Sequence, residues 1–168
     1  MTPLAGIDEG EFIAAVQASR ALHQPWIAPP ATPAAFQMLL NRTASGEVVS
    51  LVARRRDTNA LVGYLNISGI IRGPLQSAFL GYGGVAGYER RGYMRQALDL
   101  VLREAFATLG LHRLEVNIQP GNRASIALAR SAGFEREGFS PRYLKIGGRW
   151  RDHERWAILA ETWRARRV

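Results

Sequence analysis

A glycine-rich, basic segment is the part of the sequence whose residue types point most directly to a chemistry. It reads Gly-Tyr-Gly-Gly-Val-Ala-Gly-Tyr-Glu-Arg-Arg-Gly-Tyr-Met over residues 81–94, between a predicted strand and a predicted helix. Free backbone N–H groups at a helix start, with the positive end of the helix dipole, bind phosphate oxygens. Arg90, Arg91 and Arg95 add guanidinium groups that suit bidentate phosphate contact. The segment favours a phosphate-containing ligand, and the alternative is a plain tight connection.

Two polar side chains share one face of a predicted strand further along the chain. Residues 113–118 read Arg-Leu-Glu-Val-Asn-Ile and alternate strictly between polar and apolar types. Glu115 and Asn117 therefore point to the same face of the strand. A polar face of this kind needs a partner, which is either solvent with a neighbouring arginine or a substrate.

The sequence excludes several other chemistries. It contains no cysteine, so it forms neither a disulfide nor a thiolate nucleophile nor a cysteine metal site. His112 and His153 lack partners at ligand spacing, so we expect no metal site.

Four helices are predicted around these segments. Asp8 is a candidate N-cap for a helix reaching Leu22, and Thr32 followed by Pro33 starts a second one reaching about Ser45. The strongest periodicity, with apolar residues every three or four positions, predicts a helix from Met94 to Leu109. Asn122 caps a short helix that ends at Ala132 before Gly133.

The predicted strands imply a mixed sheet. Residues 48–54 and 60–71 are rich in Val, Leu and Ile on either side of a turn, and further strands are expected at 76–82 and 113–118. Gly147-Gly148 is the two-residue turn of a hairpin from Leu144 to Arg151 that continues through Leu159. Strands before and after helices, partly in hairpins, indicate an α/β or α+β fold.

Length and charge limit the remaining possibilities. The 168 residues, 47% of them hydrophobic, suit one domain over residues 1–168. The net charge of +8 suggests contact with nucleic acid, a ribosomal surface or a polyphosphate cofactor. The sequence shows no leader peptide and no long apolar run. We therefore expect a cytoplasmic protein without membrane contact, as a monomer or a homodimer.

The order of the motifs resembles that of the GCN5-related N-acetyltransferases (GNAT), specifically the RimJ-like ribosomal-protein alanine N-acetyltransferases. The resemblance covers roughly residues 60–160. Its segments are Leu61 to Tyr64, Gly81-Tyr82, Glu89 to Met94, Asn122 to Ser125, Ala132 to Gly138 and Gly148 to His153. It implies a mostly antiparallel, twisted sheet flanked by helices, with acetyl-CoA in a cleft between two splayed parallel strands that end near Gly84 and Ile118.

Acetyl-CoA is the cofactor that the resemblance implies. Its pyrophosphate would rest on the backbone amides of Arg90, Arg91, Gly92, Tyr93, Met94 and Arg95, and its pantetheine arm would pair near Gly84, Val85 and Ala86. Asn122 would cap its helix and also reach the cofactor arm. The family pattern Gln/Arg-x-x-Gly-x-Gly/Ala has two departures here, because Glu89 is an anion and Met94 replaces a small residue.

The resemblance also implies catalytic groups for a direct attack, since no cysteine exists to form an acyl-enzyme. Glu115 is the candidate base, and the alternative is a solvated strand residue paired with an arginine. Ser125 is the candidate acid for the leaving thiolate, because Ala129 stands where relatives that use a tyrosine carry it. A serine in a first helical turn is also simply compatible with that position.

The acceptor is the least determined part of the prediction. Trp26, Tyr82 and Tyr143 are expected to line an acceptor groove or to lie in the core, and Asn117 to hold a water or the substrate backbone. The leading acceptor is the N-terminal α-amino group of a ribosomal protein, with the ribosome as a possible partner. The alternatives are a small amine, such as an antibiotic or a polyamine, and a non-catalytic RNA- or ribosome-binding protein.

Overall fold

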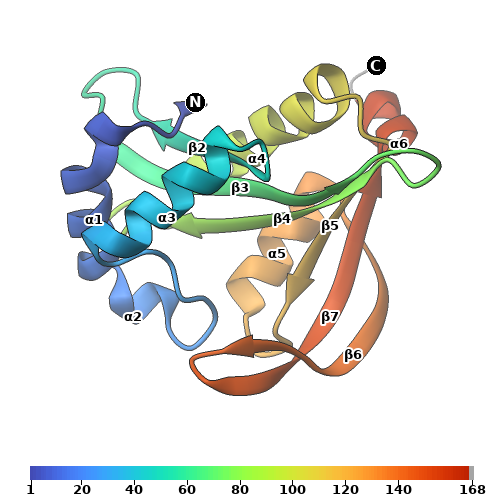
Figure 1. Cartoon of the computed structure of the whole chain (residues 1–168). Coiled ribbons are helices and arrows are strands. Elements are labelled where there is room, and N and C mark those ends of the chain that lie inside the picture. Colours follow the sequence, from blue (N-terminus) through green and yellow to red (C-terminus); the bar gives the residue numbers. More distant parts are fainter. Residues whose placement is uncertain (167–168) are drawn as a thin grey trace.

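The computed structural model describes residues 1–166 and contains a seven-stranded mixed sheet (Figure 1). The strand order is β1-β2-β3-β4-β5-β7-β6, and every neighbouring pair is antiparallel except β4 with β5. The strands are β1 (Thr2–Pro3), β2 (Val48–Arg54), β3 (Leu61–Ile71), β4 (Ser77–Gly84), β5 (Arg113–Ile118), β6 (Glu135–Ile146) and β7 (Arg149–Leu159). The predicted mostly antiparallel, mixed sheet is confirmed.

The parallel pair β4 and β5 separates soon after it forms. Only Ser77–Phe79 pairs with Arg113–Glu115, and the remaining residues of both strands have no pairing with each other. Figure 1 shows the two strands running apart from this point, with β5 heading toward the end of the sheet where α2 lies. A wedge therefore opens between the carboxyl ends of β4 and β5, as predicted.

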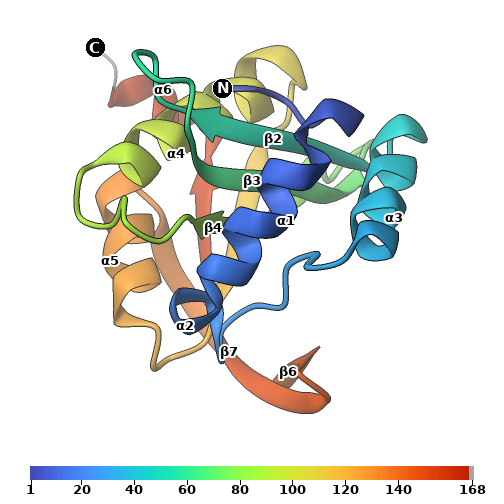
Figure 2. The same ribbon diagram turned by 90° about the vertical axis from the view of Figure 1, so that its left-hand side faces the viewer.

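Helices cover both faces of the sheet. They are the 3₁₀ turn η1 (Gly6–Asp8), α1 (Glu9–Ala18), α2 (Arg20–His23), α3 (Pro33–Ala44), α4 (Tyr93–Arg103) with the π-helical turn η2 (Glu104–Thr108), α5 (Arg123–Ala132) and α6 (Ala160–Ala165). Figure 2 shows α1 and α3 on one face and α4 and α5 on the other. No helix in residues 1–166 is long and apolar enough to cross a membrane.

Each face has its own apolar core. The larger cluster joins α4 and α5 to the sheet, and the smaller joins α1 and α3 to β2 and β3. The apolar positions that predicted the long helix are buried at Leu98, Val101, Leu102 and Phe106. The helix predicted from Met94 to Leu109 corresponds to α4 and η2, although its last turn is π-helical.

The first predicted helix is broken at Ser19. The Ser19 Oγ donates to the Ala15 carbonyl at 2.6 Å and accepts from the Ala86 N–H at 2.9 Å. A serine that bonds back to the preceding turn bends a helix. Ser19, which is fully buried, thereby fastens the junction of α1 and α2 to the loop that follows β4.

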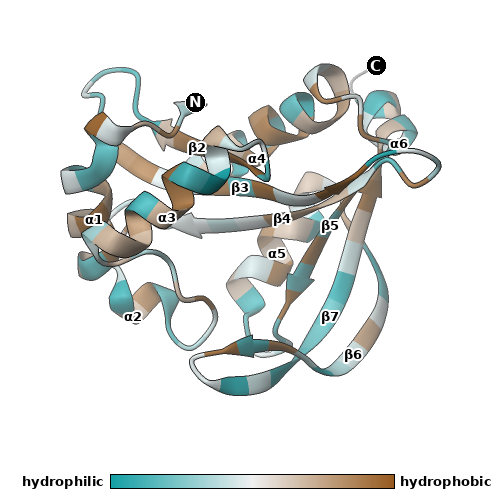
Figure 3. Cartoon of the chain, viewed as in Figure 1, coloured by the Kyte–Doolittle hydropathy of each residue, from teal (hydrophilic) through white to brown (hydrophobic). Residues whose placement is uncertain are grey.

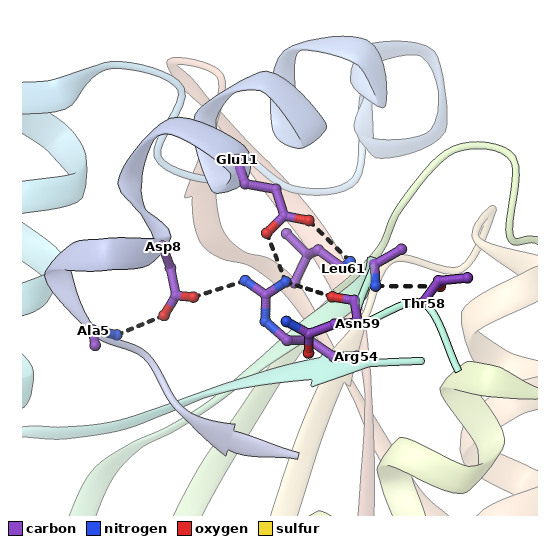
Figure 4. A network of polar contacts seen from close by, with 8 residues as sticks. Ala5, Asp8, Glu11, Arg54, Thr58, Asn59 and Leu61 are labelled. Atoms are coloured by element: carbon purple, nitrogen blue, oxygen red, sulfur yellow. Dashed lines mark hydrogen bonds and ion pairs between the residues drawn. The ribbon is translucent and has the colours of Figure 1, made fainter. Parts of the chain in front are cut away.

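Asp8 does not cap α1 with its side chain, which is a correction of the predicted cap. Its carboxylate instead accepts from the Ala5 N–H at 2.8 Å and from Arg54 Nη2 at 2.7 Å (Figure 4). Arg54 also pairs with Glu11 at 2.6 Å, and Glu11 accepts from the Leu61 N–H at 3.1 Å. This cluster fastens the start of α1 to β2 and β3.

The C-terminal hairpin is longer than predicted, because β6 begins at Glu135. Its turn is Gly147-Gly148, with φ of +57° and +78°, as the sequence predicts. β6 forms the edge of the sheet and is mostly exposed, and Figure 3 shows hydrophilic and hydrophobic residues mixed along both strands of the hairpin. The sheet opens with the two-residue strand β1.

Candidate active site

A cavity of about 950 Å³ fills the wedge between β4 and β5. Its walls come from the end of β4, the loop leading into α4, the end of β5, the start of α5 and α2. The lining includes the predicted cofactor residues Gly84, Val85, Arg90, Gly92, Tyr93, Met94, Arg95, Asn122 and Ser125. Ala86 and Arg91 are not part of it. The structure thus brings together segments from several separate parts of the sequence, from Leu22 to Leu128.

The loop before α4 has the backbone shape of an anion-binding turn. Gly87, Arg90 and Gly92 all have positive φ, at 87°, 59° and 80°. Left-handed residues interspersed in a turn aim successive N–H groups into one concavity. Glu89 folds back within this loop, where its carboxylate accepts from the Gly87 N–H at 2.8 Å. One of the loop's amides is therefore already bonded to an internal anion.

The β4 edge predicted for the pantetheine arm is partly bonded to the protein itself. The Gly84 carbonyl oxygen lies 2.8 Å from His23 Nε2. The Val85 N–H donates to the Val62 carbonyl, and the Ala86 N–H donates to Ser19 Oγ. Burial lowers the pKa of His23, so its imidazole is neutral at pH 7 and Nε2 is the donor to Gly84. Sequence reasoning missed these contacts, because they depend on where α2 packs.

Met94 fits because residue 63 is a glycine. A Cβ atom added to Gly63 would lie 2.3 Å from the Met94 sulfur. The missing side chain on β3 therefore makes room for the long side chain at the start of α4. This pairing accounts for the departure of Met94 from the small residue in the family pattern.

A second cavity of about 390 Å³ meets the first at Ile27, Gly81 and Tyr82, which line both. It lies between the proline-rich loop, α3 and the strands β3 and β4. The other lining residues are Ala28, Pro29, Pro30, Ala35, Met38, Leu39, Arg42, Tyr64 and Asn66. The surface is mostly apolar, and Arg42 is the one charged residue in this lining.

Tyr82 and Ser125 meet across the wedge. The Tyr82 hydroxyl lies 2.7 Å from Ser125 Oγ and 3.3 Å from the Ser125 carbonyl. Burial raises the pKa of Tyr82 to about 12, more than the hydrogen bond to Ser125 lowers it. Asn122 caps α5 as predicted, accepting from the Ser125 N–H at 3.1 Å. Tyr82, which lines both cavities, is thus hydrogen-bonded to a serine that lines the larger one.

Glu115 and Asn117 have different surroundings, although they share a face. Glu115 accepts from Arg113 Nε at 2.8 Å, and Arg113 also donates to Glu137 at 2.8 Å. Glu115 lines neither cavity. Asn117 lies two residues beyond the last β4 partner, lines the larger cavity, and has a buried Oδ1 without a partner in the described chain. The role of Glu115 as a base stays a prediction.

The aromatic residues expected at the acceptor side divide in the same way. Trp26 lines the larger cavity, and Tyr82 lines both cavities. Tyr143 lines neither, and its ring centroid lies 6.1 Å from that of His153 in the hairpin. Gln119 holds the Trp26 turn in place by donating to the carbonyls of Pro25 and Trp26 at 3.2 and 3.0 Å. Nothing in the spacing of Gln119 signals this contact.

Comparison with known proteins places these features in a family. The model of the acetyltransferase (GNAT) domain matches residues 2–135. A probable N-acetyltransferase, YjcK of Bacillus subtilis, is 41% identical over 99 residues, which cover 59% of this chain and 55% of that protein. The ribosomal protein uS5-alanine N-acetyltransferase of Escherichia coli is 35% identical over 107 residues, covering 64% and 55%. The chain thus matches about half the length of these relatives.

Solved structures agree with this fold. RimJ of Mycobacterium smegmatis, in complex with CoA-disulfide, has a TM-score of 0.84 at 29% identity over 95% of this chain and 80% of that one. A spermidine N-acetyltransferase of Vibrio cholerae, with CoA and spermine, has a TM-score of 0.81 at 20% identity over 96% and 95%. The latter identity supports a shared fold alone. With the matching domain model and the splayed sheet together, the chain belongs to the GNAT acetyltransferase family.

Proposed function

We propose that this protein is an acetyl-CoA-dependent N-acetyltransferase whose acceptor is the N-terminal α-amino group of a protein. The observation that carries the proposal is the meeting of two cavities of different character at Tyr82. The larger has an anion-binding loop, and the smaller is an apolar pocket. A donor and an acceptor can therefore reach one point from opposite sides.

The larger cavity fits acetyl-CoA. Its volume of about 950 Å³ suits a ligand of this size. The amides after Glu89 and the guanidinium groups of Arg90 and Arg95 would hold the pyrophosphate. Asn122 would lie beside the cofactor arm, which brings an acetyl group activated as a thioester. Because Gly84 and Ala86 are engaged by His23 and Ser19, the arm would use the remaining polar groups of this edge.

The smaller cavity supports an N-terminus rather than a polyamine. No carboxylate lines it, and its one charged side chain, Arg42, is paired with Glu47. A polycation would need anionic partners in such a pocket. A small first residue, such as alanine or serine, needs only apolar contact. The match to the uS5-alanine N-acetyltransferase of Escherichia coli supports this acceptor class.

The pKa of the acceptor amine also determines how much assistance from a general base its deprotonation needs. An α-amino group has a reference pKa of about 7.7 to 8.0, against about 10.4 for a lysine-type amine. Weak assistance is enough to supply the neutral amine. If Glu115 is the base, Glu115→Gln lowers kcat/KM at pH 7 and the loss shrinks at pH 9, where the amine is already neutral. If its ion pair with Arg113 is only structural, the variant unfolds at a lower temperature with an unchanged pH profile.

A ribosomal acceptor and a cytoplasmic location belong to the same proposal. The net charge of +8 would favour encounter with a protein presented on an anionic RNA surface. Association with ribosomes that weakens steeply as salt rises would support it. Sedimentation with ribosomes at low and high salt measures this directly.

The test of the main proposal is titration of acetyl-CoA by calorimetry, followed by assay of thiol release. Peptides beginning with alanine and serine are compared with the same peptides acetylated at the N-terminus and with spermidine. Release with the free peptides alone supports the proposal. Release with spermidine alone favours the small-amine alternative, and absence of acetyl-CoA binding favours a non-catalytic RNA-binding protein.

A further inference from the structure

Tyr82 bridges the wedge in a way that substrate contact alone does not explain. It belongs to β4, beyond the point where that strand has parted from β5. Its hydroxyl nevertheless reaches the first turn of α5 and lies 2.7 Å from Ser125 Oγ. The Ser125 backbone is fixed in turn by the cap that Asn122 forms at 3.1 Å. The two hydroxyls are therefore held together by elements on opposite sides of the cavity.

The two residues also line different spaces. Tyr82 lines both cavities, whereas Ser125 lines only the larger one. A proton that starts on the acceptor side can therefore pass through Tyr82 and Ser125 into the cofactor side. Ser125 has the donor and acceptor capacity to receive one proton while giving up another.

Other titratable groups in the larger cavity make other contacts, and Tyr88 and Tyr93 pack against each other with ring centroids 5.9 Å apart. Glu89 accepts from the Gly87 N–H, and His23 faces the Gly84 carbonyl through Nε2. Ala129, at the position where some relatives carry a tyrosine, is fully buried and offers no proton. Within residues 1–166, the Tyr82 hydroxyl is the side-chain group that contacts Ser125 Oγ.

We propose that Tyr82 is the positioning residue and proton source for Ser125, which passes a proton to the leaving thiolate. The inference rests on the proposed acetyl transfer. The amine nitrogen attacks the thioester carbonyl, so a C–N bond forms and the C–S bond breaks. The thiolate takes the Ser125 Oγ proton, and Ser125 takes the Tyr82 Oη proton. The proton lost by the acceptor nitrogen, carried by solvent, restores Tyr82, so no proton is gained or lost.

The electrostatic setting of Tyr82 keeps its phenol protonated. Burial raises its pKa to about 12, so the phenol carries its proton throughout the working pH range. The group is therefore always available as a donor, and its own ionisation contributes no limb to a pH profile below pH 10. Because a free thiol has a pKa of about 8.5, the transfer to the thiolate is favourable only when the proton released by the acceptor nitrogen replaces the one that Tyr82 gives up.

The test uses Tyr82→Phe, which removes the hydroxyl and keeps the ring. General acid catalysis contributes about 100-fold or more, so kcat should fall by about that factor. The calorimetric Kd of acetyl-CoA and the unfolding temperature should stay near those of the wild type. The solvent isotope effect on kcat should change, because the step that transfers the proton now lacks its relay.

Variants at Ser125 distinguish a relay from two separate contributions. Ser125→Ala should lose as much activity as Tyr82→Phe, and the double variant should lose no more than either single one, because groups acting in series are not additive. Ser125→Thr keeps the hydroxyl and should retain most of the activity. The inference is wrong if the fold-loss of kcat in the double variant equals the product of the two single fold-losses. It is also wrong if kcat of Tyr82→Phe lies within threefold of the wild-type value. Wild-type protein without any peptide-dependent thiol release would instead overturn the proposed function.

Discussion

Glu89 is the residue that most opposes the ligand expected in the larger cavity. Its carboxylate lies in the loop that would receive two phosphates, and it already accepts from the Gly87 N–H. Like charges at this distance repel in a partly buried site. The same contact, however, holds the loop in its anion-binding shape. Glu89 would thus stabilise the shape of the loop and weaken the binding of an anionic ligand at the same time.

We predict that Glu89→Gln strengthens acetyl-CoA binding. The amide oxygen can still accept from Gly87, so the loop keeps its shape while the negative charge is lost. Removal of one repulsive charge in a screened site corresponds to roughly 1 kcal/mol, or about a fivefold lower Kd. Calorimetry at low ionic strength measures this change.

Glu89→Ala is the matched control, because it removes the charge and the hydrogen bond together. Its Kd should lie above that of Glu89→Gln. If Glu89→Gln binds more weakly than wild type, the carboxylate is needed by the bound cofactor and the repulsion argument is wrong.

At the scale of single residues, local signals predicted more than long-range ones. Asn122 was predicted to cap a short helix, and the structure contains this cap. The alternation around Glu115 placed it on the same face as Asn117, yet only the point of strand separation decides which of them meets the cavity. That point depends on pairing with β4, more than 30 residues away in the sequence.

At the scale of elements, the contact of β3 with α4 depends on one glycine. Because a Cβ at Gly63 would lie 2.3 Å from the Met94 sulfur, Gly63→Ala overpacks this contact. Overpacking of this kind costs about 1 to 3 kcal/mol of unfolding free energy. We therefore predict a lower midpoint in urea for Gly63→Ala, with an unchanged dependence on urea concentration.

The double variant Gly63→Ala with Met94→Ala separates this contact from other effects. Removal of the methionine side chain eliminates the contact at 2.3 Å and leaves the Gly83 carbonyl oxygen, at 3.1 Å, as the nearest neighbour of the new methyl. The double variant should lose about 1 kcal/mol less unfolding free energy than the sum of the losses in the two single variants. Strictly additive losses would mean that Met94 does not limit residue 63.

The start of α1 is held by ion pairs, which gives a second prediction at this scale. The Arg54 and Asp8 side chains are only 16% and 10% exposed, so removing one partner leaves a poorly solvated charge. Arg54→Met should lower the unfolding free energy by about 2 kcal/mol. Arg42→Met is the matched control, because Arg42 and Glu47 are 48% and 58% exposed and should contribute less than about 1 kcal/mol. Equal losses in the two variants would contradict this.

The elements that sequence patterns misjudged are those set by tertiary contacts. Apolar spacing continues through Ser19, so the periodicity did not signal the break at this residue, whose hydroxyl bonds back to Ala15 and also accepts from Ala86. The first half of β6 lacks the apolar alternation of a half-buried strand, because it is an exposed edge. By contrast, β2 and β5 have the predicted bounds, since both strands bury alternate or successive residues in the core.

At the scale of the whole molecule, the wedge divides the sheet into two parts. The parts are joined by three residue pairs between β4 and β5 and by the apolar cluster that α4 and α5 share with the strands. The proposed cofactor would touch the start of α4 on one side and Asn122 and Ser125 of α5 on the other. A ligand that contacts both sides in the folded state alone must stabilise the whole chain.

We predict that acetyl-CoA raises the unfolding temperature. At a free concentration 100-fold above Kd, binding stabilises the folded state by about 2.7 kcal/mol. A chain of this length gains about 2 to 4 °C per kcal/mol, so the expected shift is roughly 5 to 10 °C. Differential scanning calorimetry over a series of acetyl-CoA concentrations measures it.

The source of this stabilisation is tested with acetyl-pantetheine, which keeps the thioester and the arm but lacks the pyrophosphate. If the loop from Glu89 to Arg95 supplies most of the binding, acetyl-pantetheine at the same concentration should shift the unfolding temperature by less than about 1 °C. Arg90→Ala should reduce the acetyl-CoA shift, and so should added salt, because exposed guanidinium contacts are screened. Equal shifts with both compounds would place the binding energy on the β4 edge, and the loop would then have no anion-binding role.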